Sequence, residues 1–144
     1  MELRTEIEID APPGAVWAVL TDLGAYPEWN PFIPHASGDL RVGGRLEVVI
    51  APPGGSEWTF RPEVLACEPG RELRWRGRLW IPGLFDGEHF FKLTELEGGR
   101  TRLVHGEDFR GLLVKLAGRA LTNTARGFVF MNHALKRRVE SPVA

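Results

Sequence analysis

Three titratable side chains in the second half of the chain could do chemistry: His89, His105 and Glu107. Each lies in a stretch where polar and apolar residues alternate, which is typical of a strand with one buried face. Lys92 has to face solvent, and its parity places His89 on the inward face. His105 and Glu107 share the inward parity of the next such stretch. A histidine and a carboxyl group on one buried face could act as general base and general acid.

The turn between these two stretches decides whether His89 meets Glu107. Directly opposed residues of an antiparallel ladder lie on the same face of the sheet. A two-residue turn at Gly98 and Gly99 would set His89 against Asp108, which breaks the parity. The sequence therefore predicts a loop of odd length or a bulge.

Two registers satisfy this requirement. A loop centred on the first of the two glycines sets His89 opposite Glu107 and Phe91 opposite His105. A loop centred on the second glycine sets Phe91 opposite Glu107 instead. Both registers remain open at the level of sequence.

A carboxylate on a buried face is costly unless it is paired, protonated or in contact with water. We expect Glu107 either to lie at the wet end of a cavity or to pair with Arg61 or Arg110 around a strand edge. Two histidines and a carboxylate are also a conceivable set of metal ligands. Because all three lie on pleated strands, we expect no metal, and nothing in the sequence calls for a cofactor.

These strands have to be positioned by a long C-terminal helix, which the pattern predicts over residues 112–139. Its apolar residues fall on one side at helical spacing and its basic residues fall on the other. The middle of the apolar stripe is thin, because Ala117, Ala120, Thr124 and Gly127 are small while both ends carry large side chains. A sheet that seals against both ends would leave a hollow beside this middle section.

The preceding residues provide that sheet. Residues 3–9 alternate as a half-buried strand, and two short helices are expected between Pro13 and Phe32. Gly and Pro turns then separate further strands, at residues 45–51, 58–68, 71–81, 84–96 and 101–109. Strands joined so closely form an antiparallel meander. We predict a single α+β domain over residues 1–144, with a curved antiparallel sheet of six to seven strands around the long helix.

The inward positions of these elements give a predicted cavity lining that is mainly aromatic and aliphatic. Such a lining with a few convergent polar groups is typical of a small-molecule pocket. The side chains expected to contact a ligand are Trp58, Phe60, Trp75, Leu79, Phe85, Phe91, Leu103, Ala120, Thr124, Gly127, Phe128 and Met131.

Composition narrows the range of partners. The 144 residues are 43% hydrophobic and 26% charged with a net charge of -1, so no basic field marks a nucleic-acid partner. The basic cluster at Lys136, Arg137 and Arg138 suits the C-terminal end of a helix. The single cysteine, Cys67, excludes an internal disulfide. No stretch approaches the length of a membrane span, and we expect a cytoplasmic protein.

Four segments of the chain resemble the SRPBCC superfamily, which includes START-related, birch-pollen-allergen-like and polyketide cyclase/dehydrase-like proteins. They are IEIDAPPGAVWAVLTDLGAYPEWNPFI (residues 7–33), GRELRWRGRL (70–79), PGLFDGEHFFKL (82–93) and TRLVHGEDFRG (101–111). The resemblance implies a helix-grip fold with an apolar cavity between sheet and helix. Members bind lipids, sterols, polyketides or hormones, and some catalyse cyclisation or dehydration. The superfamily shares no single catalytic motif, so no catalytic residue carries over.

Three functions follow as hypotheses. The first is binding of a small hydrophobic or aromatic ligand, such as a lipid or polyketide, whose polar end His89, His105 and Glu107 orient. The second is a metal-free cyclase or dehydratase that uses the same residues as base and acid. The third is a scaffold role or a homodimer through the outer surface, where Phe130 and Leu112 are expected to be exposed.

Overall fold

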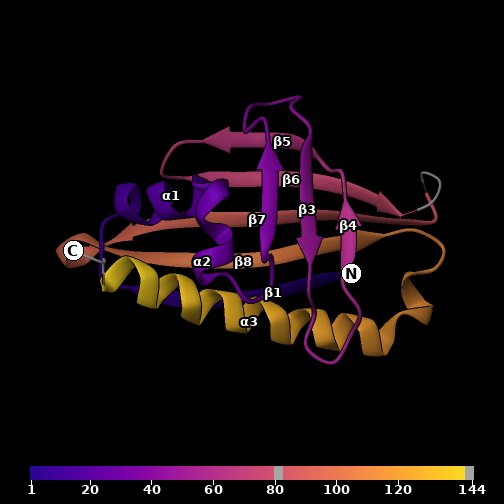
Figure 1. Cartoon of the computed structure of the whole chain (residues 1–144). Coiled ribbons are helices and arrows are strands. Elements are labelled where there is room, and N and C mark those ends of the chain that lie inside the picture. The colour runs from indigo at the N-terminus through magenta and orange to yellow at the C-terminus, as the bar shows by residue number, and fades with distance from the viewer. Residues whose placement is uncertain (80–82, 142–144) are drawn as a thin grey trace.

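The computed structural model of the chain describes residues 1–79 and 83–141 (Figure 1). The first strand, β1 (Glu2–Ile9), leads into the helix α1 (Pro13–Thr21), the 3₁₀ turn η1 (Leu23–Ala25) and the short helix α2 (Tyr26–Trp29). The other strands are β2 (His35–Gly38), β3 (Leu46–Ile50), β4 (Trp58–Phe60), β5 (Glu63–Glu68), β6 (Glu72–Leu79), β7 (Phe85–Leu96) and β8 (Arg100–Arg110). The long helix α3 (Gly118–Glu140) ends the described chain.

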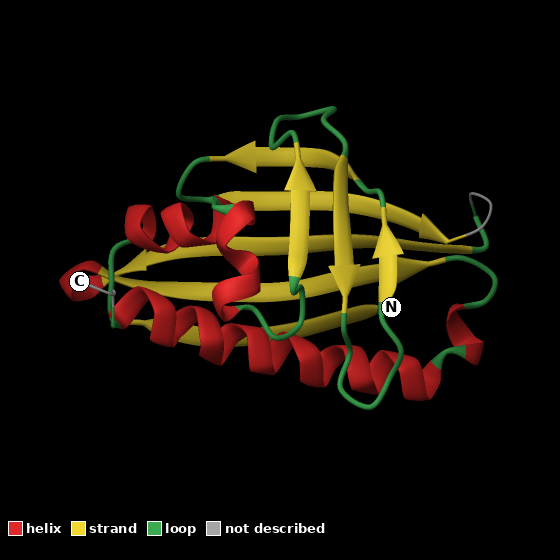
Figure 2. Cartoon of the chain, viewed as in Figure 1, coloured by secondary structure: helices red, strands yellow, loops and turns green. Residues whose placement is uncertain are grey.

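The strands form two antiparallel sheets. The larger has the order β1-β8-β7-β6-β5 and the smaller has the order β2-β3-β4. The strands of the smaller sheet run across those of the larger one. The helix α3 lies along the β1 edge of the larger sheet (Figure 2). Main-chain hydrogen bonds from Leu46 N to Pro62 O (3.0 Å) and from Val64 N to Gly44 O (2.9 Å) join the two sheets at the start of β5.

The predicted α+β class, the two short helices and the long C-terminal helix are confirmed, while two boundaries differ. The strand expected over residues 58–68 is divided into β4 and β5, because Pro62 has no N–H to donate to a ladder. Eight strands in two sheets thus replace the expected six to seven in one. The long helix begins at Gly118 instead of residue 112, since Leu112 and Leu113 donate their N–H groups to Gly83 O and Leu84 O.

None of the helices formed by the described residues combines the length and the apolar character needed to cross a membrane.

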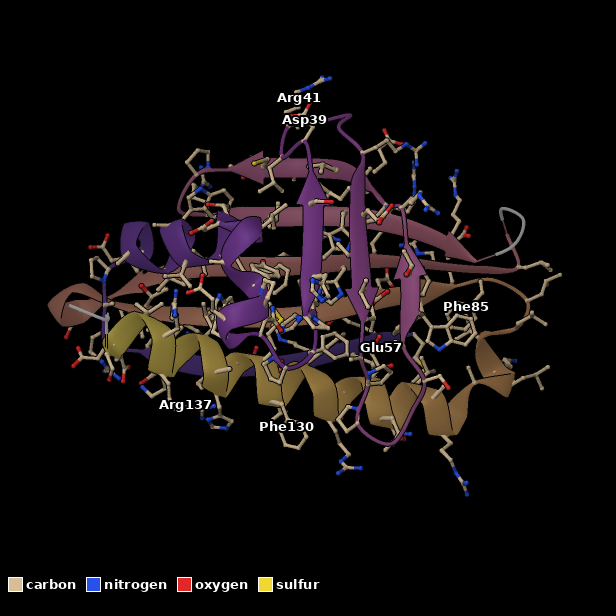
Figure 3. All side chains as sticks on the ribbon, in the orientation of Figure 1. Asp39, Arg41, Glu57, Phe85, Phe130 and Arg137 are labelled. Atoms are coloured by element: carbon tan, nitrogen blue, oxygen red, sulfur yellow. The ribbon has the colours of Figure 1, made fainter. Side chains whose placement is uncertain are left out.

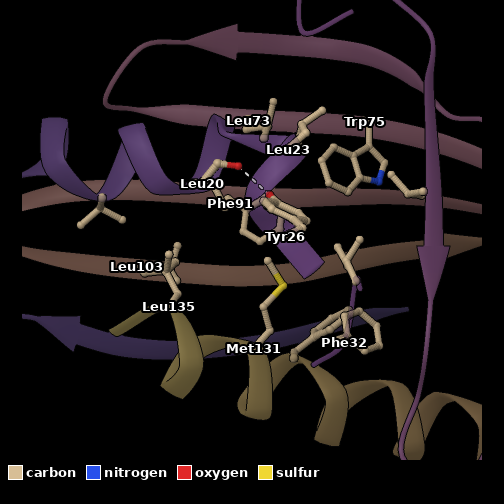
Figure 4. Close-up of a cluster of buried hydrophobic side chains, with 14 of the residues drawn as sticks. Leu20, Leu23, Tyr26, Phe32, Leu73, Trp75, Phe91, Leu103, Met131 and Leu135 are labelled. Carbon is tan, nitrogen blue, oxygen red and sulfur yellow. Dashed lines mark hydrogen bonds between the residues drawn. The ribbon is translucent and has the colours of Figure 1, made fainter. Parts of the chain in front are cut away.

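The core lies between the second half of α3 and the large sheet (Figure 4). Met131 and Leu135 of α3 are fully buried against Phe91 and Leu103 of the sheet. The two short helices close one end of this core, and the hydroxyl of the fully buried Tyr26 donates to a main-chain oxygen within them.

Phe32 fills the space where the sequence predicts a hollow beside Gly127. Its ring lies edge-on to Phe128, with ring centroids 5.4 Å apart. A Cβ atom added to Gly127 would lie only 2.3 Å from Phe32 Cδ1. Glycine at this point of α3 therefore allows the aromatic ring to approach the helix, and the predicted cavity does not extend to Gly127.

Gly127→Ala is expected to destabilise the protein by up to about 2 kcal/mol. Alanine is the better helix former by about 1 kcal/mol, but the added methyl group overpacks a buried ring at a cost of about 1–3 kcal/mol. Gly118→Ala is the matched control, because nothing lies within 4 Å of its added Cβ. Urea unfolding measures the free energy of unfolding of both variants and of the wild type. A Gly127→Ala protein more stable than the wild type by about 1 kcal/mol, as helix propensity alone would give, would contradict this close packing.

Candidate functional site

A cavity of about 440 Å³ lies between the two sheets and the first turns of α3. The small sheet and the loop between β3 and β4 form one wall, and α3 with the turn before it forms the other wall. The middle of β6, the first part of β7 and the last part of β8 form the floor. The lining residues are Phe32, Val48, Ile50, Pro52, Gly55, Ser56, Trp58, Phe60, Pro62, Trp75, Gly77, Phe85, Gly87, His89, Glu107, Phe109, Leu113, Leu116, Ala117, Ala120, Leu121, Asn123 and Thr124.

The structure places about half of the predicted ligand-binding residues in this lining. Those that line the cavity, besides His89 and Glu107, are Trp58, Phe60, Trp75, Phe85, Ala120 and Thr124. Phe85 lies near the beginning of α3 (Figure 3).

Five other predicted lining residues lie in the packed interior: Phe91, Leu103, Gly127, Phe128 and Met131. These five residues do not line the cavity because Phe32 and the aromatic rings around His105 fill the space beside the second half of α3. The side chain of Leu79 lies outside the described part of the structure.

The hairpin of β7 and β8 adopts the first of the two predicted registers. Its loop is centred on Gly98, whose φ of 77° is in the left-handed region that glycine favours. His89 is therefore opposite Glu107, and Phe91 is opposite His105. The Nδ1 atom of His89 lies 3.0 Å from Oε1 of Glu107.

This contact is one end of a buried chain of hydrogen bonds. Nε2 of His89 lies 2.7 Å from Nε2 of His105, and Nδ1 of His105 lies 2.8 Å from Oδ1 of Asn132 on α3. Nδ2 of Asn132 donates to the hydroxyl of Thr5 at 2.8 Å, and that hydroxyl donates to the main-chain oxygen of His105 at 2.7 Å. The chain links three strands to the long helix beneath the cavity floor.

Aromatic rings hold the two histidines in place. Trp75 stacks on His89 with an interplanar angle of 10°, and its own ring lines the cavity. Phe91 and Phe128 both stack on His105, with centroids 4.4 and 4.3 Å away. His105 is fully buried and does not line the cavity. It would therefore affect a bound molecule only indirectly, through its hydrogen bond to His89.

Burial favours the uncharged form of all three titratable groups. It lowers the pKa of His89 to about 3 and raises the pKa of Glu107 to about 8. Burial, with the neighbouring imidazole of His89, lowers the pKa of His105 well below its ordinary value. Near neutral pH the Glu107 carboxyl is therefore protonated and its contact with His89 is a hydrogen bond between neutral groups.

The expected pairing of Glu107 with an arginine is not found. Arg61 pairs with Glu47 at 3.2 Å, and Arg110 pairs with Asp108 at 3.0 Å, on the outer face of the sheets. Within residues 1–79 and 83–141, no group of three His, Cys, Asp or Glu side chains is arranged to hold a metal ion.

Two glycines form the part of the floor next to Glu107. Gly77 of β6 is directly opposite Gly87 of β7. A Cβ atom on Gly87 would lie 2.1 Å from Oε2 of Glu107, whereas one on Gly77 would lie 3.9 Å from the nearest atom, in Phe60. Gly87 thus leaves room for the carboxyl group, and Gly77 leaves open space in the cavity.

Sequence reasoning missed Phe32, Gly87, Asn132 and Thr5. The sequence did indicate Asn132, because this polar residue lies one helical turn after Phe128 on the apolar side of the helix. In the structure Asn132 is 2% exposed. A polar residue at a core position needs a hydrogen-bond partner on the facing sheet. Thr5 is likewise a polar residue at an inward position, since it shares the parity of Leu3 and Ile7 in the first strand. Phe32 and Gly87 gave no such indication, because their roles depend on which segments meet in space.

Antiparallel sheets that hold a long C-terminal helix over an apolar cavity, with the acid Glu107 in the cavity floor, place the protein in the helix-grip class of folds. The family model described as polyketide cyclase / dehydrase and lipid transport matches residues 1–140. The chain belongs to this family, which confirms the resemblance to SRPBCC proteins. No curated protein matches the chain.

Solved structures show the same fold. Protein MLL2253 from Mesorhizobium loti is 24% identical with a TM-score of 0.76, and the match covers 100% of both chains. Protein TTHA0849 from Thermus thermophilus is 20% identical with a TM-score of 0.73, again over 100% of both chains. A START superfamily protein from Mycobacterium smegmatis is 22% identical over 99% of both chains, with a TM-score of 0.69.

Gly87→Ala is expected to cost about 1–2 kcal/mol of stability. The added methyl group displaces the Glu107 carboxyl and breaks its hydrogen bond to His89, and such a bond contributes about 1 kcal/mol net. Gly77→Ala is the control on the opposite strand and should change stability by less than about 0.5 kcal/mol. Equal losses in urea unfolding would argue against a carboxyl group held over Gly87.

Stability is expected to fall as pH rises from about 6.5 to about 8. Folded protein keeps the Glu107 proton, whereas the unfolded chain, with an ordinary pKa of 4.5, has already lost it. The unfolded state thus binds fewer protons, and the free energy of unfolding decreases by up to about 1.4 kcal/mol per pH unit from this group. The two histidines are neutral in the folded state throughout this range.

Glu107→Gln is the matched control, because its amide cannot ionise but can donate to His89 Nδ1. Urea unfolding across this pH range should show a smaller decrease for Glu107→Gln than for the wild type. Parallel pH profiles would mean that Glu107 is ionised in the folded protein.

Proposed function

We propose that the protein binds a small hydrophobic or aromatic ligand, such as a lipid or a polyketide, in the cavity between its sheets and α3. The observation that carries this proposal is the cavity of about 440 Å³ with its mainly apolar lining. This volume is within the range of pockets for small organic molecules, which is about 300–1,000 Å³. The family description, with its cyclases, dehydrases and lipid transport, supports the same class of ligand.

The polar groups of the lining are few and separated. Glu107 lies in the floor with 17% of its side chain exposed, while Ser56 and Asn123 belong to the walls. Trp58 and Leu116 line the cavity and are 48% and 82% exposed, so they mark its rim. A ligand would place its apolar body among the aromatic rings and one polar group at Glu107.

A second candidate is acid/base chemistry of the cyclase or dehydratase kind, favoured by the 3.0 Å contact of His89 with Glu107 in the cavity floor. The geometry changes the roles expected from sequence. Both ring nitrogens of His89 are engaged, by Glu107 and by His105. The carboxyl group of Glu107 would therefore exchange the proton with a substrate, and His89 and His105 would act as positioning residues.

The binding proposal is tested with Thr124→Phe and Thr122→Phe. Both threonines lie on α3 and donate to the main-chain oxygen four residues earlier, but only Thr124 lines the cavity, whereas Thr122 is exposed. Affinity for a neutral apolar fluorescent dye should fall at least about tenfold in Thr124→Phe, because the added ring occupies the cavity. Thr122→Phe should bind as the wild type does.

Mass spectrometry of the purified protein after incubation with a mixed lipid and aromatic extract gives the second readout. Compounds retained by the wild type and by Thr122→Phe, but lost from Thr124→Phe, are ligands of the cavity. A compound recovered in chemically altered form would favour the second candidate. Dye binding that is absent, or equal in all three proteins, would refute the binding proposal.

A further inference from the structure

We propose that the end of the ligand that reaches the cavity floor carries a neutral hydroxyl group, as in a phenol or an alcohol, and that this group donates a hydrogen bond to Oε2 of Glu107. The inference rests on the proposed ligand-binding function and adds the chemical class of the ligand. It follows from the direction of the buried hydrogen-bond chain.

That direction is set by a group that can only accept. The main-chain oxygen of His105 receives the hydroxyl proton of Thr5, so the Thr5 oxygen is free to accept from Asn132 Nδ2. Asn132 then presents its Oδ1 atom to His105, and an amide oxygen has no proton to give. The proton in the 2.8 Å contact must therefore be on Nδ1 of His105.

The remaining steps follow in the same way. A neutral His105 with its proton on Nδ1 has a lone pair on Nε2, so Nε2 of His89 must be the donor in the 2.7 Å contact between them. The last proton lies between His89 Nδ1 and Glu107 Oε1, which are 3.0 Å apart. Whichever of these two atoms holds it, Oε2 of Glu107 has only lone pairs to offer.

Oε2 has no hydrogen-bond partner among the described residues, and the Glu107 side chain is part of the cavity floor. Gly87 lies against this oxygen on one neighbouring strand, and the apolar Leu3 is the opposed residue on the other. His89, with His105 behind it, is the titratable group that faces Glu107 across the ladder. An unpaired acceptor in an apolar cavity selects for a ligand that donates.

Other common polar groups fit this position less well. A ketone or an ether has only acceptors and would set one lone pair against another. A carboxylate also lacks a donor, and it would bring a negative charge to an acid in surroundings that disfavour charge. A neutral hydroxyl group satisfies Oε2 without adding charge.

The test compares ligands that share one ring system, by displacement of the neutral apolar dye at pH 7. We expect 2-naphthol to bind at least about tenfold more tightly than 2-methoxynaphthalene, in which the donor is replaced by a methyl ether. We expect 2-naphthoate to bind most weakly of the three. In Glu107→Met the preference for 2-naphthol over the ether should disappear, while Glu95→Met, an exposed position on β7, should retain it.

The outcomes separate this inference from the binding proposal. Equal affinities for the hydroxyl compound and its ether, or tightest binding of the carboxylate, would overturn the inference while dye binding upholds the cavity function. Failure of the dye and all three compounds to bind would refute both. If Glu107→Met does not fold, the comparison of the three ligands on the wild type decides the matter.

Discussion

The contact between Phe32 and Gly127 divides the space between α3 and the sheets into two parts. On one side, the large apolar residues of α3 pack solidly against the large sheet, and this half supplies the buried area that stabilises the fold. On the other side, the helix surface includes smaller residues such as Ala120 and Thr124, and the cavity lies over them. The ring of Phe32 belongs to both parts, because it packs on Phe128 and also lines the cavity.

The row of polar side chains from Thr5 to Glu107 lies at this boundary. His89, His105 and Asn132 are buried where unpaired polar groups are costly, while Thr5 and Glu107 at the ends are half-buried. Each member satisfies the next by a hydrogen bond. Asn132 has a particular part in this, since one amide group serves both a histidine and a hydroxyl from different strands. A row that is satisfied at every step allows polar groups under an apolar cavity. It leaves one oxygen of Glu107, whose side chain lines the cavity, without a partner among the described residues.

Periodicity was sufficient to predict the fold class, the inward parity of His89, His105 and Glu107, and the two registers of their hairpin. These features depend on neighbours along the chain, and a polar or apolar side chain reports directly on the face it occupies. The position of the cavity depends on a contact between residues far apart in sequence, Phe32 and Gly127, and small residues alone do not report whether a distant ring fills the space beside them. For this reason two small residues of the same stripe differ in the structure: Thr124 lines the cavity, whereas Gly127, one turn further along, packs against Phe32.

The buried row also limits what chemistry the cavity could support. It ends at a main-chain oxygen, which accepts a hydrogen bond but cannot take up a proton and pass it on. A proton that Glu107 accepted from a bound molecule would therefore have to return to that molecule or leave through the cavity. Such a site suits reactions that move a proton within one molecule or remove a hydroxyl group as water, where the same carboxyl group takes and gives the proton. The proposed ligand binding and this kind of acid/base chemistry would thus use the same oxygen of Glu107, and they would differ in whether the bound molecule has a proton that the carboxyl group can remove.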